Sequence, residues 1–266
     1  ATVNSMRIVL DSVEYDKAKK NVDQLENEYA TLLLNRGLVL YKHGAASEAY
    51  IAFMKCNALF DESCANNKYT NIACLHNLAT CQMNMGNYSD AINTLTRIKK
   101  TIEEDFGINS KLYASVLMSH AWYYGTIRDN DKAMGFSRQA ALVSKEIGDE
   151  NGFAVATYDI GVGLYYNGNL VEAKQYLKEA LAYMEFHEFG YKWMLSKLYQ
   201  TLFSVSYELG EYEEGIQYYD KATQLVESIY GRHSLEYAEL LGAKGLTLFK
   251  NNDEDALGLL GNAVET

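Results

Sequence analysis

The sequence of 266 residues contains no proline, although average usage of about 5% would give a chain of this length roughly a dozen. Proline breaks a helix because it lacks a backbone N–H and its ring clashes with the preceding turn. Its absence therefore permits long uninterrupted helices. Tyrosine, in contrast, is abundant, with 22 residues. A flat apolar ring with a polar tip suits the half-exposed surfaces between stacked helices and in grooves.

The sequence also lacks an excess of positive charge. It has 24 Lys and Arg against 35 Asp and Glu, which gives a formal net charge of −11. Binding to nucleic acid requires clustered cations that neutralise phosphates, so this balance argues against a nucleic-acid partner and against an anionic membrane surface. A basic or neutral polypeptide partner remains compatible with it.

Cysteine pairs and long apolar runs are missing as well. The four cysteines form no C-x-x-C pair, so we expect free thiols and a reducing compartment; they are Cys56, Cys64, Cys74 and Cys81. No run of 18 apolar residues occurs, and we expect no membrane insertion. The first residues do not look like a signal peptide. We therefore expect a cytoplasmic protein; the alternative is an exported form whose leader has been removed, because the sequence does not begin with methionine.

Catalytic signatures are absent too. The five histidines show no H-E-x-x-H pattern and no mutual helical spacing; they are His43, His76, His120, His187 and His233. Gly161-Val162-Gly163 is not a dinucleotide fingerprint, since no strand is expected before it and no third glycine follows. No Walker A loop and no G-x-S-x-G elbow occurs. We expect no catalytic site, no metal and no cofactor, and predict that the protein is not an enzyme.

What the sequence does contain is one repeating period. A small residue recurs at intervals of 40 to 42 residues, each time about four residues after a turn rich in Gly or Asn. About twelve residues earlier stands a second position that is usually small. Apolar residues surround both at helical spacing, which predicts two antiparallel helices per unit, A and B, packed through the small positions. The first series is Ala49, Ala91, Ala133, Ala173, Gly215 and Ala256, and the second is Gly37, Ala79, Ala121, Gly161, Phe203 and Gly245.

The pattern resembles the tetratricopeptide repeat (TPR) family, and the period near 41 residues makes it most similar to the long-helix kinesin light chain and Pins type. One unit that matches well carries Leu75, Leu78, Ala79, Gly86, Tyr88, Ala91, Leu95 and Ile98. Unit three departs at Arg128, which replaces the turn glycine. The runs from Gly107 to Ala114 and from Gly231 to Ala238 share a G-x-x-S-x-x-Y-A frame.

The resemblance implies an all-α fold, a right-handed superhelical solenoid of about six TPR helix-turn-helix repeats. We expect residues 1–27 to form a lead-in helix that caps the array. The array then spans residues 28–266, in units near 28–66, 67–108, 109–149, 150–189, 190–232 and 233–266.

In such arrays the A helices line a concave groove that binds partners. We therefore predict a scaffold that binds a protein or peptide in this groove. The partner is expected to be basic, in view of the acidic balance, or extended. The resemblance implies that asparagines such as Asn35 and Asn77 hold a peptide backbone; the alternative is that they cap or bridge helices. Counting from the small position of each A helix gives the expected contact residues: Asn35, Tyr41, His76, Asn77, Thr80, Asn84, Ser119, Trp122, Tyr158, Asp159, Tyr165, Tyr166, Gln200 and Tyr207.

Two other functions stay open at this point. One is a regulator that senses a signalling peptide, as in the Gram-positive quorum-sensing proteins whose TPR domains resemble this sequence. The other is the binding module of a larger enzyme or secretion-related protein. Additional sequence outside these residues would distinguish them.

Overall fold

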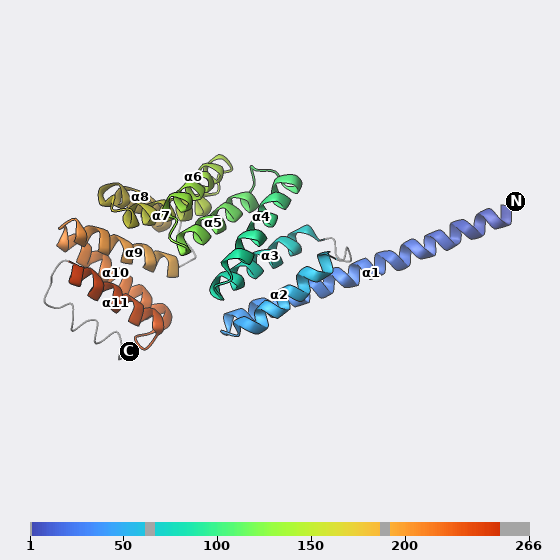
Figure 1. Cartoon of the computed structure of the whole chain (residues 1–266), viewed down its shortest axis with the longest axis horizontal. Helices are drawn as coiled ribbons and strands as arrows, with labels where there is room; N and C mark the ends of the chain where they lie inside the picture. Colours follow the sequence, from blue (N-terminus) through green and yellow to red (C-terminus); the bar gives the residue numbers. More distant parts are fainter. Residues whose placement is uncertain (1, 62–66, 187–191, 251–266) are drawn as a thin grey trace. The chain divides into compact units, whose positions relative to one another are not determined.

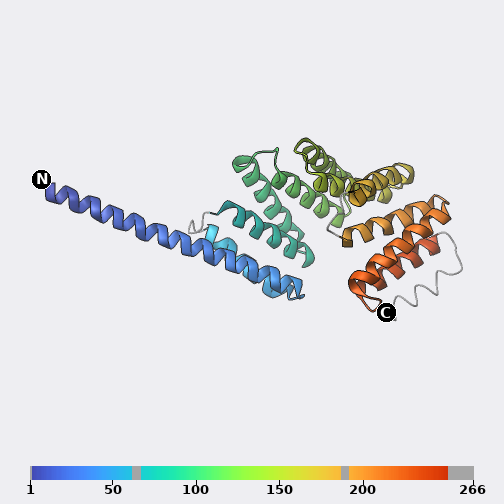
Figure 2. The same cartoon turned by 180° about the vertical axis from the view of Figure 1, so that it is seen from behind.

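The computed structural model describes residues 2–61, 67–186 and 192–250. Within these ranges the chain forms eleven α-helices and no strand, so the all-α prediction is confirmed. The helices pack as successive antiparallel hairpins, the architecture of a TPR-like solenoid (Figures 1 and 2). The chain divides into two compact units, residues 1–104 and 105–266.

The first unit, unit 1, contains α1 (Thr2–Lys42), α2 (Ala46–Asp61), α3 (Lys68–Asn84) and α4 (Tyr88–Asp105). The C-terminal part of α1 buries Ala30, Leu33 and Leu34, and α1 packs against α2 and α3. Its N-terminal part runs far beyond both (Figure 1). The expected boundary after residue 27 therefore falls inside one continuous helix, so the proposed lead-in segment and the first A helix are a single element.

The described residues of the second unit, unit 2, form three complete hairpins and one further helix. The A helices are α5 (Lys111–Thr126), α7 (Glu150–Tyr166), α9 (Lys192–Glu208) and α11 (Leu235–Lys250); the B helices are α6 (Asn130–Glu146), α8 (Leu170–Phe186) and α10 (Tyr212–Tyr230). Contacts join α5 to α7, α7 to α9 and α9 to α11. We call the surface made by these four helices the A-helix face. The predicted turn at 251–253 and the marker Ala256 lie outside the described residues.

The turns inside the hairpins share one backbone geometry. Gly44, Gly86, Gly168 and Gly210 have φ between +77° and +81°, the left-handed conformation that closes a helix C-terminus. Arg128 occupies the same place in the third hairpin with φ of +63°. Its N–H still donates to the carbonyl of Gly125 at 3.0 Å, as the N–H of Gly168 donates to Tyr165. The departure seen in the sequence therefore leaves the turn unchanged, at the modest cost of a left-handed non-glycine residue.

The crossing of helices A and B also follows the predicted small positions. A Cβ atom added to Gly161 would stand 2.8 Å from the Leu177 side chain and 3.3 Å from the Ala173 carbonyl. In the next hairpin Phe203 replaces that glycine and is fully buried. Gly215 lies opposite, where a Cβ atom would meet the Phe203 carbonyl at 3.3 Å. The small residue has thus moved from helix A to helix B, so the two backbones can still approach closely.

The shared G-x-x-S-x-x-Y-A frame proves to be a helix start. The Oγ of Ser110 accepts a hydrogen bond from the N–H of Tyr113 at 3.2 Å, and Ser234 does the same for Tyr237. Each serine hydroxyl also donates to a carbonyl three residues earlier. The frame thereby fixes where α5 and α11 begin, and with them the register of the A-helix face.

Cysteines contribute to the core of unit 1. Cys56, Cys74 and Cys81 are free and buried, whereas Cys64 lies outside the described residues. The Sγ of Cys56 donates to the carbonyl of Ala30, and that of Cys74 to the carbonyl of Phe53. Weak donors of this kind satisfy backbone carbonyls where the helices cross. Across the described ranges, no helix combines the length and apolar character needed to traverse a bilayer.

Candidate functional site

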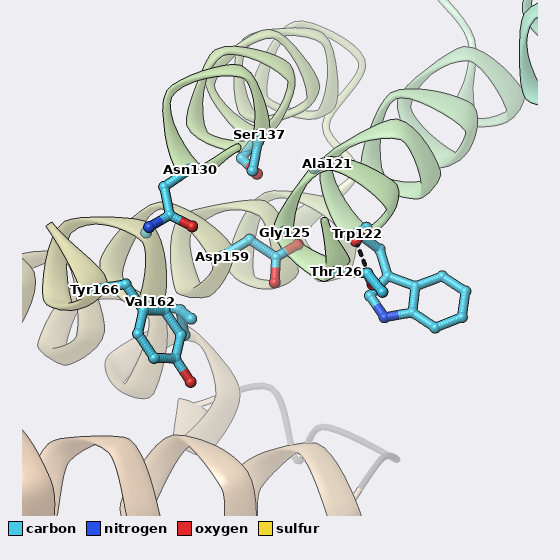
Figure 3. Close-up of a pocket in the computed structure, with 11 residues that line it drawn as sticks. Ala121, Trp122, Gly125, Thr126, Asn130, Ser137, Asp159, Val162 and Tyr166 are labelled. Atoms are coloured by element: carbon cyan, nitrogen blue, oxygen red, sulfur yellow. Dashed lines mark hydrogen bonds between the residues drawn. The ribbon is translucent and has the colours of Figure 1, made fainter. Parts of the chain in front are cut away.

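Two adjoining hollows lie on the A-helix face of unit 2. The first hollow encloses about 300 Å³ between α5, α6 and α7 (Figure 3). Its walls combine apolar and aromatic surface with a few polar groups, the usual composition of a ligand pocket. It is lined by Ala121, Trp122, Gly125, Thr126, Asn130, Ala133, Ser137, Asp159, Val162, Gly163 and Tyr166.

Asp159 contributes a carboxyl group to this hollow. Its carboxyl lies between the Trp122 side of α5 and the Tyr166 end of α7 (Figure 3). No described residue forms a hydrogen bond or an ion pair with it. Burial alone raises the pKa of the carboxyl to about 7, because the surroundings disfavour the charged form. A carboxylate here would gain much from a cationic partner.

The second hollow, of about 420 Å³, adjoins the first, because Val162 and Tyr166 line both. It is enclosed by α7, α9 and α11 and has a more polar lining. Burial raises the pKa of its Tyr158 hydroxyl to about 12, and a hydrogen bond with Thr201 opposes this shift. The lining residues are Tyr158, Val162, Tyr165, Tyr166, Lys197, Gln200, Thr201, Ser204, Ala243, Leu246, Thr247 and Lys250.

The charges of the second hollow are already paired. The Tyr165 hydroxyl donates to Glu208 at 2.8 Å, and the Lys250 ammonium donates to the same carboxylate oxygen at 3.0 Å. Lys197 pairs with Glu239 across α9 and α11 at 2.9 Å. These contacts tie neighbouring A helices together. The charged side chains of the second hollow are thus held in place by ion pairs, whereas the first hollow contains an unpaired acid.

Six of the eight contact residues predicted in unit 2 line the two hollows. They are Trp122 and Asp159 in the first, Tyr158, Tyr165 and Gln200 in the second, and Tyr166 in both. The other two do not belong to either. Ser119 is buried and donates to the Ser115 carbonyl of its own helix at 3.0 Å. Tyr207 is buried, and its ring packs edge-on against Tyr212 at 4.6 Å.

Two of the six contact residues predicted in unit 1 bond within their own helix, and two others bond to each other across helices. The Nδ2 of Asn77 donates to the Ala73 carbonyl at 2.7 Å, and the Thr80 hydroxyl to the His76 carbonyl at 3.0 Å. Asn84 donates to the Tyr41 hydroxyl at 2.6 Å, which links α3 to α1. Asn35 is exposed and His76 half-buried. Asn77 therefore binds its own helix rather than capping or bridging another, and ligand contact by these residues stays a prediction.

Among the lining residues that were not predicted, two groups are informative. Asn130, Ala133 and Ser137 reach the first hollow from α6, because the start of a B helix borders the A-helix face. Leu246 and Lys250 reach the second hollow from α11. The offsets used for the other A helices would have found both, since they stand one and five residues after the small Gly245. Within the described residues, no three His, Cys, Asp or Glu side chains cluster so that they could hold a metal ion.

No protein-family model matches the sequence, and no curated protein matches it significantly. Several solved structures are similar in fold. A Rap protein complexed with Competence and Sporulation Factor matches 95% of this chain with a TM-score of 0.73 and 16% identity. Aspartyl phosphate phosphatase F from Bacillus subtilis matches 95% with a TM-score of 0.70 and 15% identity.

A third similar structure contains the TPR-like repeats of a putative kinesin light chain from Podospora anserina. It matches 75% of this chain and 96% of its own, with a TM-score of 0.58 and 11% identity. The chain spans 66% of the Rap protein and 63% of the phosphatase. These likenesses, with the repeat period and the hairpin geometry, show that the chain has the fold of the tetratricopeptide-repeat proteins.

Proposed function

We propose that the A-helix face of unit 2 binds an extended peptide segment of a protein partner, with a basic side chain seated beside Asp159. The observation that carries the proposal is the pair of adjoining hollows with one unpaired carboxyl. Apolar pockets with a few convergent polar groups are the usual form of a binding site. A site that follows the A helices suits a chain in extended conformation better than a compact ligand.

The lining supplies both kinds of contact that an extended peptide requires. Trp122 is 46% exposed and Tyr166 is 69% exposed, so both rings offer aromatic surface that binding would bury. Large aromatic residues contribute most of the energy in many interfaces. Gln200 and Thr201 lie in the second hollow and can donate to or accept from a peptide backbone. Recognition of the backbone would not depend on its sequence.

Selectivity would come from the first hollow. A Lys or Arg side chain that enters it meets the Asp159 carboxylate between two aromatic residues, and aromatic faces also attract cations. The net charge of −11 adds a long-range attraction for basic segments. A partner with clustered phosphates, such as nucleic acid, would be repelled.

The role proposed is non-catalytic. Asp159 has no nucleophile among its described hydrogen-bond partners, and the ionisable groups of the second hollow are tied to one another. A Rap protein of similar fold was solved in complex with Competence and Sporulation Factor, which supports a ligand-binding use of this fold. Free, buried cysteines favour a reducing compartment, and we infer a cytoplasmic location.

Selection from random short peptides displayed on phage would test the proposal. Peptides retained by the wild-type protein should be enriched in Lys and Arg. Asp159→Asn should abolish that enrichment, while the matched change Asp220→Asn on the outer helix α10 should keep it. Trp122→Ala should weaken every selected peptide, and Trp193→Ala, the same change at the other tryptophan, should not. Retained peptides that ignore both Asp159 and Trp122 would refute the proposed site.

A further inference from the structure

Ion pairs join the B helices α8 and α10 of unit 2, outside the A-helix face. Lys174 of α8 contacts the carboxylates of both Glu211 and Glu214, and its ammonium lies 2.5 Å from Glu214. Lys178, one turn further along α8, pairs with the same Glu214 at 2.8 Å. We call Lys174, Lys178, Glu211 and Glu214 the brace, because they connect two hairpins that are successive along the chain.

The brace is partly withdrawn from water. The Lys174 side chain is only 12% exposed. Hydrogen bonds from Lys174 and Lys178 lower the pKa of the Glu214 carboxyl to about 2, so this acid stays charged over the ordinary pH range. Exposed ion pairs stabilise little, but removing one member of a buried pair leaves a desolvated charge behind. The brace therefore links α8 to α10 more strongly than the other described pair between them, Glu185 with Lys221, in which both side chains are about half exposed.

The two hairpins pack against each other mainly through α8 and α9. The backbones of these two helices lie close together, whereas those of α8 and α10, and of α7 and α9, approach each other far less. Helix α9 packs tightly on α10, and α11 packs on both, so α9, α10 and α11 form one group that can tilt about its contact with α8. Side-chain links on the two sides of that contact limit the tilt. The brace holds α10 to α8, and the hydrogen bond from Tyr165 to Glu208 holds α9 to α7.

We propose that the brace sets the width of the second hollow, because it holds α10 to α8 and thereby keeps α11 away from α7. A tilt that moves α10 away from α8 carries α11, which belongs to the A-helix face, towards α7. The second hollow is enclosed by α7, α9 and α11, so the same tilt narrows it. The four residues of the brace stand outside the lining of that hollow and act on it through the helices. The proposal does not depend on any ligand, since it concerns the width of the hollow in the free protein.

Distances measured by pulsed electron paramagnetic resonance on the free protein test the proposal. One pair of spin labels replaces Gln175 of α8 and Gln217 of α10, which are exposed and stand at equivalent positions of two successive repeats. This pair reports on the braced side. A second pair replaces Tyr166 of α7 and Leu246 of α11, which line the second hollow and are more than half exposed. Labels attached to ketone-bearing amino acids leave the native cysteines unmodified.

Charge reversal breaks the brace and can also restore it. The variant K174E/K178E sets like charges against each other, so the distance on the braced side should increase and the distance across the hollow should decrease, each by about 2 Å or more. Adding E211K/E214K to this variant makes the charges opposite again and should move both distances back towards those of the wild type. Lys174→Met removes one charge without repulsion and should shift both distances in the same directions by less. It gives the same test if charge reversal unfolds unit 2.

The matched control K99E/K100E makes the same change of net charge on α4, where the two lysines pair with Glu103 and Glu104 of their own helix. It should leave both distances unchanged. Two distances that also stay unchanged when the brace is broken overturn the proposal. An increase of both distances overturns it too, because the hairpins then separate without tilting. The proposal is equally wrong if the swapped variant keeps the altered distances, since the charges of the brace would then not be their cause.

Discussion

The two hollows of the A-helix face are built on the same repeat, but the charged side chains are paired in the second hollow and unpaired in the first. In the second hollow, Glu208 accepts from both Tyr165 and Lys250, and Lys197 is paired with Glu239. In the first, Asp159 has no described partner, and burial holds its pKa near 7. A paired charge stabilises the helices it joins, whereas an unpaired one destabilises the fold and gains from a ligand.

This difference suggests separate roles on one continuous surface: the paired charges of the second hollow hold the helices together, and the unpaired acid of the first selects the ligand. Tyr166 and Val162 belong to both hollows, so a ligand that spans the face contacts both environments. We expect the second hollow to contribute mainly shape and backbone contacts. The first should decide which side chains are accepted. Each prediction below tests that division, beginning with the largest effect.

Removing the Asp159 charge should have the largest effect on binding. A hydrogen bond to a charged group is worth about 1.5–3 kcal/mol, so Asp159→Asn should weaken a Lys- or Arg-containing peptide by roughly 10- to 150-fold at pH 8. Isothermal titration calorimetry with a selected peptide measures it. Replacing the basic residue of that peptide by norleucine should cost a similar amount in wild type and almost nothing in the variant. Equal loss in both proteins would contradict a direct pairing.

The pH dependence of binding should be the next largest effect. A cationic side chain binds the deprotonated form of Asp159, whose pKa is about 7. Affinity should therefore be constant above pH 7 and fall by up to about tenfold for each pH unit below it. Tyr158, with a pKa of about 12, does not titrate there. Fluorescence of Trp122 in a Trp193→Phe background gives the binding curve at each pH, and Asp159→Asn should remove the dependence.

Much of this arrangement could be predicted from the sequence, because the outward face stands at the same offset from the small position in every A helix. The small positions Ala121, Gly161 and Phe203 locate the outward faces of α5, α7 and α9. Counting from them gives Trp122, Asp159 and Gln200, all of which line the hollows. Residues at the same offset in each repeat therefore recur on the same face of the array.

The remaining features depend on packing that the repeat does not specify. Tyr207 and Ser119 have the spacing of the predicted face, yet both are buried in the packed structure. Arg128 departs from the turn pattern, yet its backbone takes the same left-handed conformation. The raised pKa of Asp159 comes from desolvation by its surroundings in the hollow. Such burial is a tertiary effect that residue types and spacing do not contain.

Asp159→Asn should also change stability, in the direction opposite to its effect on binding. The folded carboxyl has a pKa of about 7 against an ordinary value of 3.8, so the folded chain retains a proton that the unfolded chain releases. Stability is therefore lost as pH rises from about 4 to 7. At about 1.4 kcal/mol for each pKa unit, the variant should be more stable than wild type by up to about 4 kcal/mol at pH 8 and equal to it at pH 4. Urea unfolding at both pH values measures this, with Asp220→Asn as a control that shows no such difference.

The smallest expected effect comes from the paired acid of the second hollow. Lys250 is 59% exposed and Glu208 21% exposed, so solvent screens their pair, and Glu208→Gln should lower the free energy of unfolding by only about 0.5–1 kcal/mol. The amide oxygen can still accept from the Tyr165 hydroxyl, which keeps α7 and α9 joined. Peptide affinity should change less than about threefold by the same reasoning. If Glu208→Gln lowered the affinity for basic peptides as much as Asp159→Asn, the second hollow would also bind the cationic side chain. Only the loss of a carboxylate that contacts the ligand can reduce the affinity that much.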